Sequence, residues 1–146
     1  MRCNSLYMIK GIEKYDIKVL LALYEALKGR KDFFKFLAKN GYPELAAFSN
    51  AVRGDIDAML WLFKYHYEWL AILSNAIDGE AEAREWIRKN TTEVNLHFAL
   101  ACRKEPVAMK WLADHDLQIF LMMAKEIDIV LDTQMKENLS WYTTKF

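Results

Sequence analysis

A repeat of 25 residues constrains the fold of this chain more than any other feature of its sequence. Each register has an alanine, followed ten residues later by an aromatic residue and then by leucine or isoleucine. The alanines stand at positions 26, 51, 76 and 101, and the aromatic residues are Phe36, Trp61, Trp86 and Trp111. A unit of this length can hold two short helices and a turn, and it needs neighbours to bury its apolar face. The sequence therefore predicts a stack of helical hairpins.

The repeat divides the chain into units. We expect an all-α fold, a right-handed stack of about ten helices. Four two-helix units are expected over residues 17–42, 43–68, 69–92 and 93–116. A degenerate capping unit should follow over residues 117–140, with one helix over 117–125 and a second over 129–138. The chain of 146 residues has the length of one ordinary domain, so we assign residues 1–146 to a single helical-repeat domain.

The second unit illustrates how each hairpin is expected to form. Its first helix is predicted over residues 44–53, and Gly54 then suits the left-handed conformation that follows many helix ends. Asp55 or Asp57 can cap the next helix, predicted over residues 57–67, by accepting a backbone hydrogen bond. Apolar bulk for the core is expected from Met59, Leu60, Trp61 and Phe63.

The repeated small and large residues predict how the units pack. An alanine on each facing helix lets neighbouring units approach closely, and a large side chain from the second helix fills the space beside it. We therefore expect Trp61, Trp86 and Trp111 to form a spine through the core.

Composition favours helices and argues against two classes of partner. The chain has only two prolines and five glycines, although 53% of its residues are hydrophobic. Its 20 basic and 20 acidic side chains balance, which provides no basic excess for phosphate binding. No stretch approaches the roughly 20 apolar residues of a membrane span. We expect no membrane partner and no nucleic acid, while zero net charge is compatible with a homo-oligomer.

The two cysteines bear on the cellular compartment. Cys3 and Cys102 are too few for the disulfide framework of a short secreted chain. The N-terminal residues contain no long apolar run, so no signal peptide is expected. We predict two reduced thiols and a cytoplasmic location.

The repeated positions resemble a known family. The pattern of Ala51, Gly54, Ala58, Trp61 and Leu62 is similar to the helix-turn-helix core of ankyrin repeats, and it recurs at Ala76, Gly79, Ala83, Trp86 and Ile87. Ankyrin units have 33 residues and a β-turn finger, whereas these shorter units lack both the finger and the Thr-Pro-Leu-His signature. The resemblance covers about residues 17–113. It implies an ankyrin-like α-solenoid that binds another protein.

Two sets of residues are candidates for binding a partner. The tips between paired helices carry a ladder of polar side chains, which should line one edge of the stack. The run around residue 66 is rich in tyrosine, which is common at interface hot spots. The alternative interpretations are ordinary solvent-facing polarity for the ladder and packing between units for the tyrosines. The candidates in the polar ladder are Lys28, Arg53, Asp78 and Arg103, and the tyrosine candidates are Tyr65 and Tyr67.

No catalytic residue, metal site or cofactor is expected. His66, His97 and His115 form no i, i+4 pair, and His97 is interpreted as a partly buried residue paired with Glu93. Residues 114–116 (Asp-His-Asp) fit a polar turn, because consecutive side chains rarely converge on one ion. Asp128 and Asp132 are one helical turn apart and are interpreted as a solvated acidic edge.

The repeat predicts a protein-interaction module that presents a rigid surface, since solenoids offer extended binding faces. One alternative is an enzyme or ligand-binding domain with a pocket between helices, which would require a buried titratable cluster near His97 or Asp128. A second alternative is a nucleic-acid-binding repeat, which would require basic side chains to gather on one face. Those basic side chains are Lys28, Arg30, Lys31, Arg53 and Arg103.

Overall fold

Nine α-helices and one short 3-10 helix make up the part of the chain that the structure describes. The structure is a computed structural model that describes residues 10–145, with side chains through residue 139. No strand occurs within these residues, so the prediction of an all-helical fold is confirmed. In chain order the helices are η2 (Ile12–Lys14), α1 (Ile17–Leu27), α2 (Lys31–Lys39), α3 (Pro43–Val52), α4 (Ile56–Lys64), α5 (Glu68–Ile77), α6 (Ala81–Asn90), α7 (Glu93–Ala101), α8 (Pro106–Asp114) and α9 (Gln118–Lys145).

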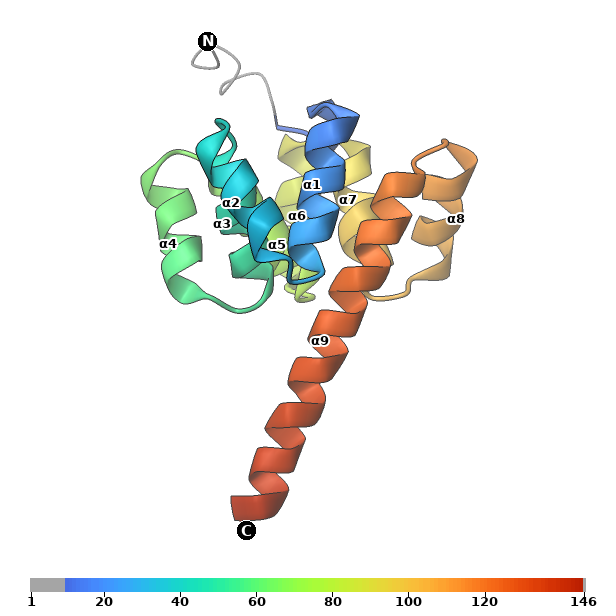
Figure 1. The fold of residues 1–146 in the computed structure, drawn as a ribbon. Helices are drawn as coiled ribbons and strands as arrows, with labels where there is room; N and C mark the ends of the chain where they lie inside the picture. Colours follow the sequence, from blue (N-terminus) through green and yellow to red (C-terminus); the bar gives the residue numbers. More distant parts are fainter. Residues whose placement is uncertain (1–9, 146) are drawn as a thin grey trace.

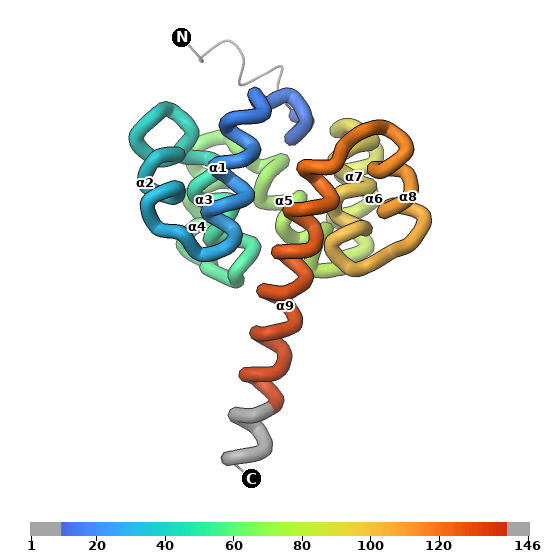
Figure 2. Tube along the Cα trace, turned by 45° about the vertical axis from the view of Figure 1, so that its right-hand side comes forward, coloured from blue at the N-terminus to red at the C-terminus, as the bar shows by residue number. Residues whose placement is uncertain are grey.

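The first eight α-helices pack as neighbouring pairs, and the odd-numbered helices form an inner ring. Helix α1 contacts α3, α3 contacts α5, α5 contacts α7, and α7 contacts α9. Helix α9 also contacts α1, so the ring is closed (Figures 1 and 2). The even-numbered helices pack outside their partners, and the outward faces of α2, α4, α6 and α8 therefore make up much of the molecular surface.

The C-terminal region differs from the predicted capping hairpin. Residues 118–145 form one continuous helix, α9, in place of two short helices. The predicted break at residues 126–128 (Glu-Ile-Asp) contains neither glycine nor proline, so nothing there interrupts helical hydrogen bonding. The first half of α9 packs against α1, α7 and α8, and its C-terminal half extends beyond the helical ring (Figure 1).

A short N-terminal segment ties the two ends of the repeat together. The backbone N–H of Ile12 donates to Oδ1 of Asn95 on α7 at 2.9 Å, and Asn95 Nδ2 donates to the carbonyl of Lys10 at 2.7 Å. Thr92 Oγ1 donates to Glu13 Oε1 at 2.9 Å. Asn95 is fully buried, and these bonds satisfy both ends of its amide, which would otherwise be costly to bury.

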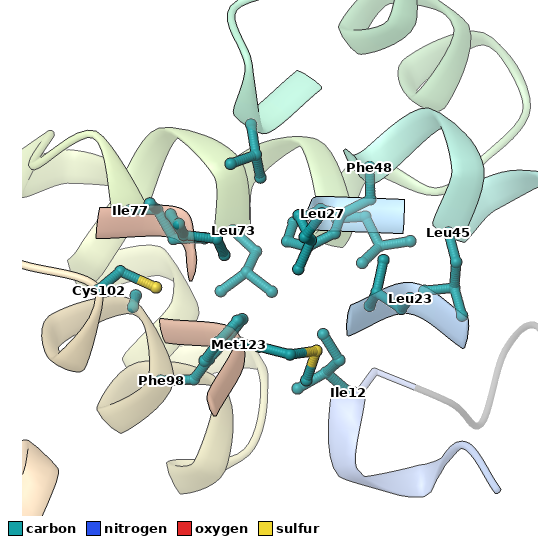
Figure 3. Packing of buried hydrophobic residues seen from close by; sticks show 14 of the residues in the cluster. Ile12, Leu23, Leu27, Leu45, Phe48, Leu73, Ile77, Phe98, Cys102 and Met123 are labelled. Carbon is teal, nitrogen blue, oxygen red and sulfur yellow. The ribbon is translucent and has the colours of Figure 1, made fainter. Parts of the chain in front are cut away.

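The inner helices supply most of the core, both its repeated alanines and its large apolar side chains, and each outer helix adds a buried aliphatic residue. The repeated alanines at 26, 51, 76 and 101 are all buried. Each outer helix contributes a large aliphatic residue with no exposed surface, namely Leu37, Leu62, Ile87 or Leu112. Figure 3 shows the centre of the ring, where Leu23, Leu27, Leu73, Phe98 and Met123 meet.

The prediction that the three tryptophans form a spine through the core is wrong, because the next residue in each helix holds the buried position. Trp61, Trp86 and Trp111 are only partly buried and pack against the edge of the core, while the residue after each of them is buried completely. A step of one residue turns a helix by about 100°, so only one of two adjacent apolar positions can point inward. The indole lies at the edge, where its N–H stays close to water.

The turns repeat their backbone conformation as well as their sequence. Gly29, Gly54 and Gly79 have φ angles of 95°, 91° and 99°, as expected for the residue after a helix end. Lys104, which replaces glycine in the fourth register, keeps the left-handed conformation with a φ of 63°. The packing of the hairpin therefore determines the backbone conformation of this turn, because a lysine adopts the same left-handed conformation as the glycines.

Candidate protein-interaction surface

Two residues of the predicted polar ladder hold neighbouring hairpins together. Arg53 follows α3 and donates from Nη2 to the carbonyls of Ala26 and Leu27 at the C-terminal end of α1. Arg103 follows α7 and donates to the carbonyls of Ile77 and Asp78 at the end of α5, both at 2.9 Å. Helix ends leave carbonyls without intrahelical partners, and a guanidinium satisfies several at once. Each of these arginines therefore caps the inner helix of the preceding hairpin.

The other two ladder residues make weaker contacts. Lys28 lies 3.9 Å from Glu25 and 5.1 Å from the centre of the Tyr24 ring. Partial burial raises the pKa of the Asp78 carboxyl, while the nearby Arg103 lowers it in part. Of the four predicted ladder residues, Arg53 and Arg103 are therefore already bonded to backbone carbonyls, and Lys28 and Asp78 are exposed.

Tyr65 and Tyr67 both contact Trp61. The Tyr65 ring centre is 4.6 Å from that of Trp61, and Tyr67 stacks parallel to Trp61 at 6.1 Å. Tyr67 is partly buried at the start of α5, whereas Tyr65 is exposed after α4. Tyr67 therefore contributes to the joint between hairpins, and Tyr65 remains accessible.

Two of the three histidines stack on a tryptophan, whereas His66 lies 3.8 Å from Glu68. The His97 and His115 rings lie against Trp111, with centres 4.0 Å and 3.9 Å from it. The Nδ1 atom of His97 lies 2.8 Å from the carbonyl of Glu93, so the predicted link between these residues involves the backbone and not the carboxylate. No group of three potential metal ligands occurs within residues 10–145.

The remaining acidic candidates lie on α9. Asp128 pairs with Lys104 at 3.3 Å and Asp132 pairs with Lys136 at 3.2 Å. Asp128 borders a cavity of about 430 Å³ whose other lining residues are mostly apolar, among them Met109, Leu121 and Ile129. The other titratable groups that line this cavity are Lys104 and Lys125, and both are exposed, so Asp128 does not belong to a buried titratable cluster.

The thiol of Cys102 is also buried. Burial raises its pKa well above the ordinary value, which disfavours the reactive thiolate. Cys102 is a free cysteine, and Cys3 lies outside the described residues.

A groove runs along the inner side of α2, between this helix and α3 and α4. Its first part, of about 490 Å³, is lined by three basic side chains that the sequence places close together, Arg30, Lys31 and Lys35. Its second part, of about 340 Å³, is lined mostly by apolar side chains, among them Ala38, Pro43 and Trp61, and also by Asp55 and Asp57. Phe34 and Asn50 line both parts, which makes them continuous. We call this feature the α2 groove.

The basic side chains of the α2 groove are only partly neutralised. Arg30 Nε lies 3.2 Å from Glu25 Oε2, and Arg53, at the same end, is bonded to helix carbonyls. Lys31 and Lys35 are exposed, and no carboxylate of residues 10–139 forms an ion pair with either. The groove therefore has an apolar part and a cationic end.

The outward face of α4 carries a second feature, an apolar stripe formed by Ile56, Leu60 and Phe63. These side chains are 72%, 59% and 40% exposed, at a spacing that places them on one side of the helix. The prediction that Leu60 and Phe63 supply core bulk is wrong, because Ala58 and Leu62 fill that role. The repeat itself indicates that these two positions are exposed, because the residues 25 positions after Leu60 and Phe63 are the charged Glu85 and Arg88.

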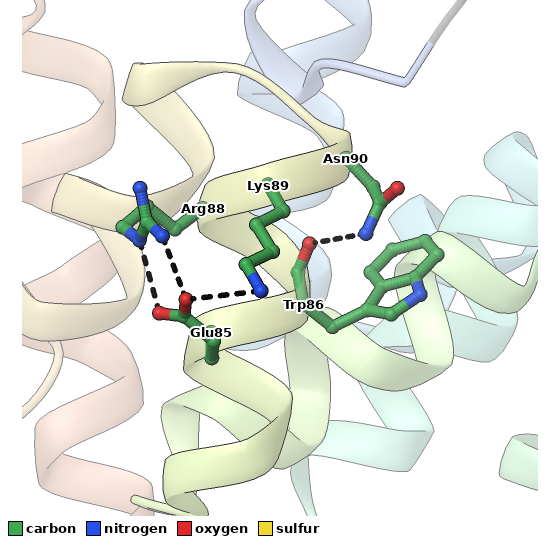
Figure 4. Close-up of polar contacts among 5 residues, drawn as sticks. All are labelled: Glu85, Trp86, Arg88, Lys89 and Asn90. Carbon is green, nitrogen blue, oxygen red and sulfur yellow. Dashed lines mark hydrogen bonds and ion pairs between the residues drawn. The ribbon is translucent and has the colours of Figure 1, made fainter.

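Helix α6 carries charged residues at the positions related to Leu60 and Phe63. Arg88 makes two hydrogen bonds to Glu85, at 2.9 Å and 2.6 Å, and Lys89 lies 3.6 Å from the same carboxylate (Figure 4). The bond from Arg88 is the main reason why the pKa of Glu85 is lowered to about 2. Repeat-related positions that are charged and solvated on α6 are thus apolar on α4.

Comparison with known proteins gives no relative. No protein-family model, no curated protein and no solved structure matches this chain. Within residues 10–145, no helix combines the length and apolar character needed to cross a membrane.

Proposed function

We propose that this protein is an interaction module whose α2 groove binds a segment of another protein that carries both apolar and acidic side chains. The observation that carries the proposal is the joining of an apolar cleft to a cationic end. Pockets that bind ligands are typically concave and largely apolar, with a few polar groups that fix orientation.

The apolar part of the groove suits an inserted side chain. Ala38, Pro43 and Ala46 leave room that larger residues would fill, and Phe34 and Trp61 offer ring surface beside it. An aromatic or aliphatic anchor that enters such a cleft gains free energy from burial, as anchor residues at protein interfaces do.

The cationic end suits carboxylates. Lys31 and Lys35 lie one turn apart on α2, so both can reach acidic side chains of a bound segment. Because these lysines are exposed, their contribution should favour recognition and association rate more than tight binding.

Selection from a displayed library of short random peptides tests this function. We expect the selected peptides to combine aromatic or aliphatic residues with Asp or Glu. A variant with Lys31→Glu and Lys35→Glu should bind them at least about tenfold more weakly in fluorescence anisotropy, because two attractive charges become repulsive. Ala38→Trp, at an exposed position, should block the apolar part.

Lys18→Glu is the matched control, since Lys18 is an exposed lysine that does not line the groove. Binding by this variant should be unchanged. Selected peptides that are basic, or that bind all variants equally, would contradict the proposal.

Two broader assignments accompany this function. We propose that the four hairpins are a shortened ankyrin-like repeat, supported by the recurring Ala, Gly and Trp positions. A cytoplasmic setting remains a prediction, which the buried free thiol of Cys102 supports.

A further inference from the structure

We infer that the apolar stripe of α4 is the contact surface between two copies of this chain, with their α4 helices packed antiparallel about a two-fold axis near Leu60. This interface goes beyond the proposed function, because its apolar side chains Ile56, Leu60 and Phe63 do not line the α2 groove, although Asp57 beside them does.

The stripe complements itself. Ile56 and Phe63 lie on either side of Leu60 along the helix. A two-fold axis at Leu60 that reverses the helix direction places Ile56 of one copy against Phe63 of the other and brings the two Leu60 side chains together. Such isologous contacts, in which the same patch serves both copies, are the commonest way in which soluble proteins form homodimers.

The charges beside the stripe select a second copy in this orientation. Asp57 and Lys64 lie on the same flank of α4, at opposite ends, about equally far from Leu60. Reversal of the helix direction therefore brings Asp57 of each copy beside Lys64 of the other. Neither side chain forms an ion pair within the described residues, so both are available for this contact.

The size of the patch predicts a weak dimer. Helix α4 has nine residues, and only three of its apolar side chains are more than a third exposed. Interfaces that bury less than about 1,200 Å² in total are generally transient. We therefore expect a monomer–dimer equilibrium that depends on concentration.

Analytical ultracentrifugation of the full chain tests the inference. The unmodified protein should shift from monomer to dimer as its concentration is raised from about 5 to 500 μM. Leu60→Glu should weaken dimerisation on the order of tenfold or more, because it places two carboxylates at the centre of the contact. The fold should tolerate this change, since α6 carries Glu85 at the related position.

Val107→Glu is the matched control. Val107 lies on α8 and is 72% exposed, like Ile56, but it lies outside the stripe. This variant should dimerise as the unmodified chain does.

A charge exchange tests the orientation. Asp57→Lys alone and Lys64→Asp alone should each weaken dimerisation, because each sets like charges opposite one another. An equimolar mixture of the two variants should restore it as a heterodimer, in which both facing pairs are again opposite in sign. Circular dichroism confirms that each variant is folded.

Three results would overturn the inference. The first is a chain that stays monomeric over this whole concentration range, as it would if the stripe served a different protein. The second is a dimer that survives Leu60→Glu, and the third is a mixture of the two charge variants that associates no better than either one alone.

Discussion

The α3–α4 hairpin and the α5–α6 hairpin follow the same plan, and they differ most on the outward faces of their second helices. Both place a buried alanine in the last turn of the first helix, a glycine with positive φ after that helix, and a fully buried aliphatic residue in the second helix. On the outside, α4 exposes Ile56, Leu60 and Phe63, whereas α6 carries an ion network centred on Glu85.

The start of the second helix also differs. The Asp55 carboxylate accepts a hydrogen bond from the Ala58 N–H at 3.2 Å and caps α4, while the side chain of Glu80 makes no such bond to α6. Packing thus conserves the inward positions of a repeat, and the outward positions are free to specialise. In a repeat protein, departures from the repeat at solvent-facing positions are therefore the first place to look for binding.

The largest expected effect concerns the fully buried aliphatic residue that both hairpins have in their second helix. Leu62→Ala and Ile87→Ala should each lower the free energy of unfolding by about 3 kcal/mol, since each removes a completely buried side chain and leaves a cavity. Urea denaturation followed by circular dichroism measures both. Leu60→Ala, on the exposed face of the same helix, should change stability by less than about 0.5 kcal/mol. A cost for Leu60→Ala close to that of Leu62→Ala would show that the two faces of α4 are assigned wrongly.

A smaller effect concerns how the hairpins end. His66, after α4, has a φ of 69°, a conformation that costs a residue with a side chain more than glycine. His66→Gly should therefore stabilise the fold by about 0.5–1 kcal/mol in the same denaturation assay. Thr91 holds the related position after α6, but its backbone is extended and its hydroxyl donates to the Ile87 carbonyl at 2.6 Å. Thr91→Gly should destabilise, and a change of the same sign in both variants would contradict this explanation.

The smallest effect concerns the charged face of α6. Arg88 lowers the pKa of Glu85 to about 2 from the ordinary value of 4.5, so the ionised carboxylate favours the folded state. That contribution is present above about pH 4.5 and is lost as the pH falls toward 2. Glu85→Gln should therefore lower the melting temperature slightly at pH 7, and the difference should shrink below pH 4.5.

The apolar face of α4 supplies the control for this titration. Leu60→Gln, at the related position, should show no such dependence on pH. An NMR titration of the Glu85 carboxyl gives a direct measurement, and a midpoint near 4.5 would contradict the assigned ion pair.

The hairpins could be predicted from the sequence because their determinants are local. Alanine, glycine and an aromatic residue at fixed spacing indicate two helices and a turn, and the expected first helix of the second unit, residues 44–53, is close to α3 (Pro43–Val52). The inward residue was harder to choose, because Trp61 and Leu62 are adjacent and both apolar. That choice depends on the rotation of the helix about its axis, which the neighbouring units set.

The closure of the ring and the α2 groove could not be predicted in this way. Closure depends on the contact between α1 and α9, which lie about a hundred residues apart and share no local pattern. Of the two groove lysines, Lys31 was named from the sequence as part of a small basic set and Lys35 was missed, because the cleft beside them is formed by three different helices. Arg53 and Arg103 were correctly placed at the hairpin tips, but their carbonyl partners lie on the preceding hairpin.

The contact between α1 and α9 also limits how a protein of this design can evolve. Open arrays lengthen readily, because an inserted repeat meets the same neighbours as every other repeat. Here an additional hairpin would separate the first inner helix from the last one and would leave both with uncovered apolar surface. Repeat proteins usually gain binding area by duplication of single units. In this protein such a duplication would break the contact between α1 and α9. New specificity has to come from substitution at outward positions, or from surfaces that two whole molecules create together.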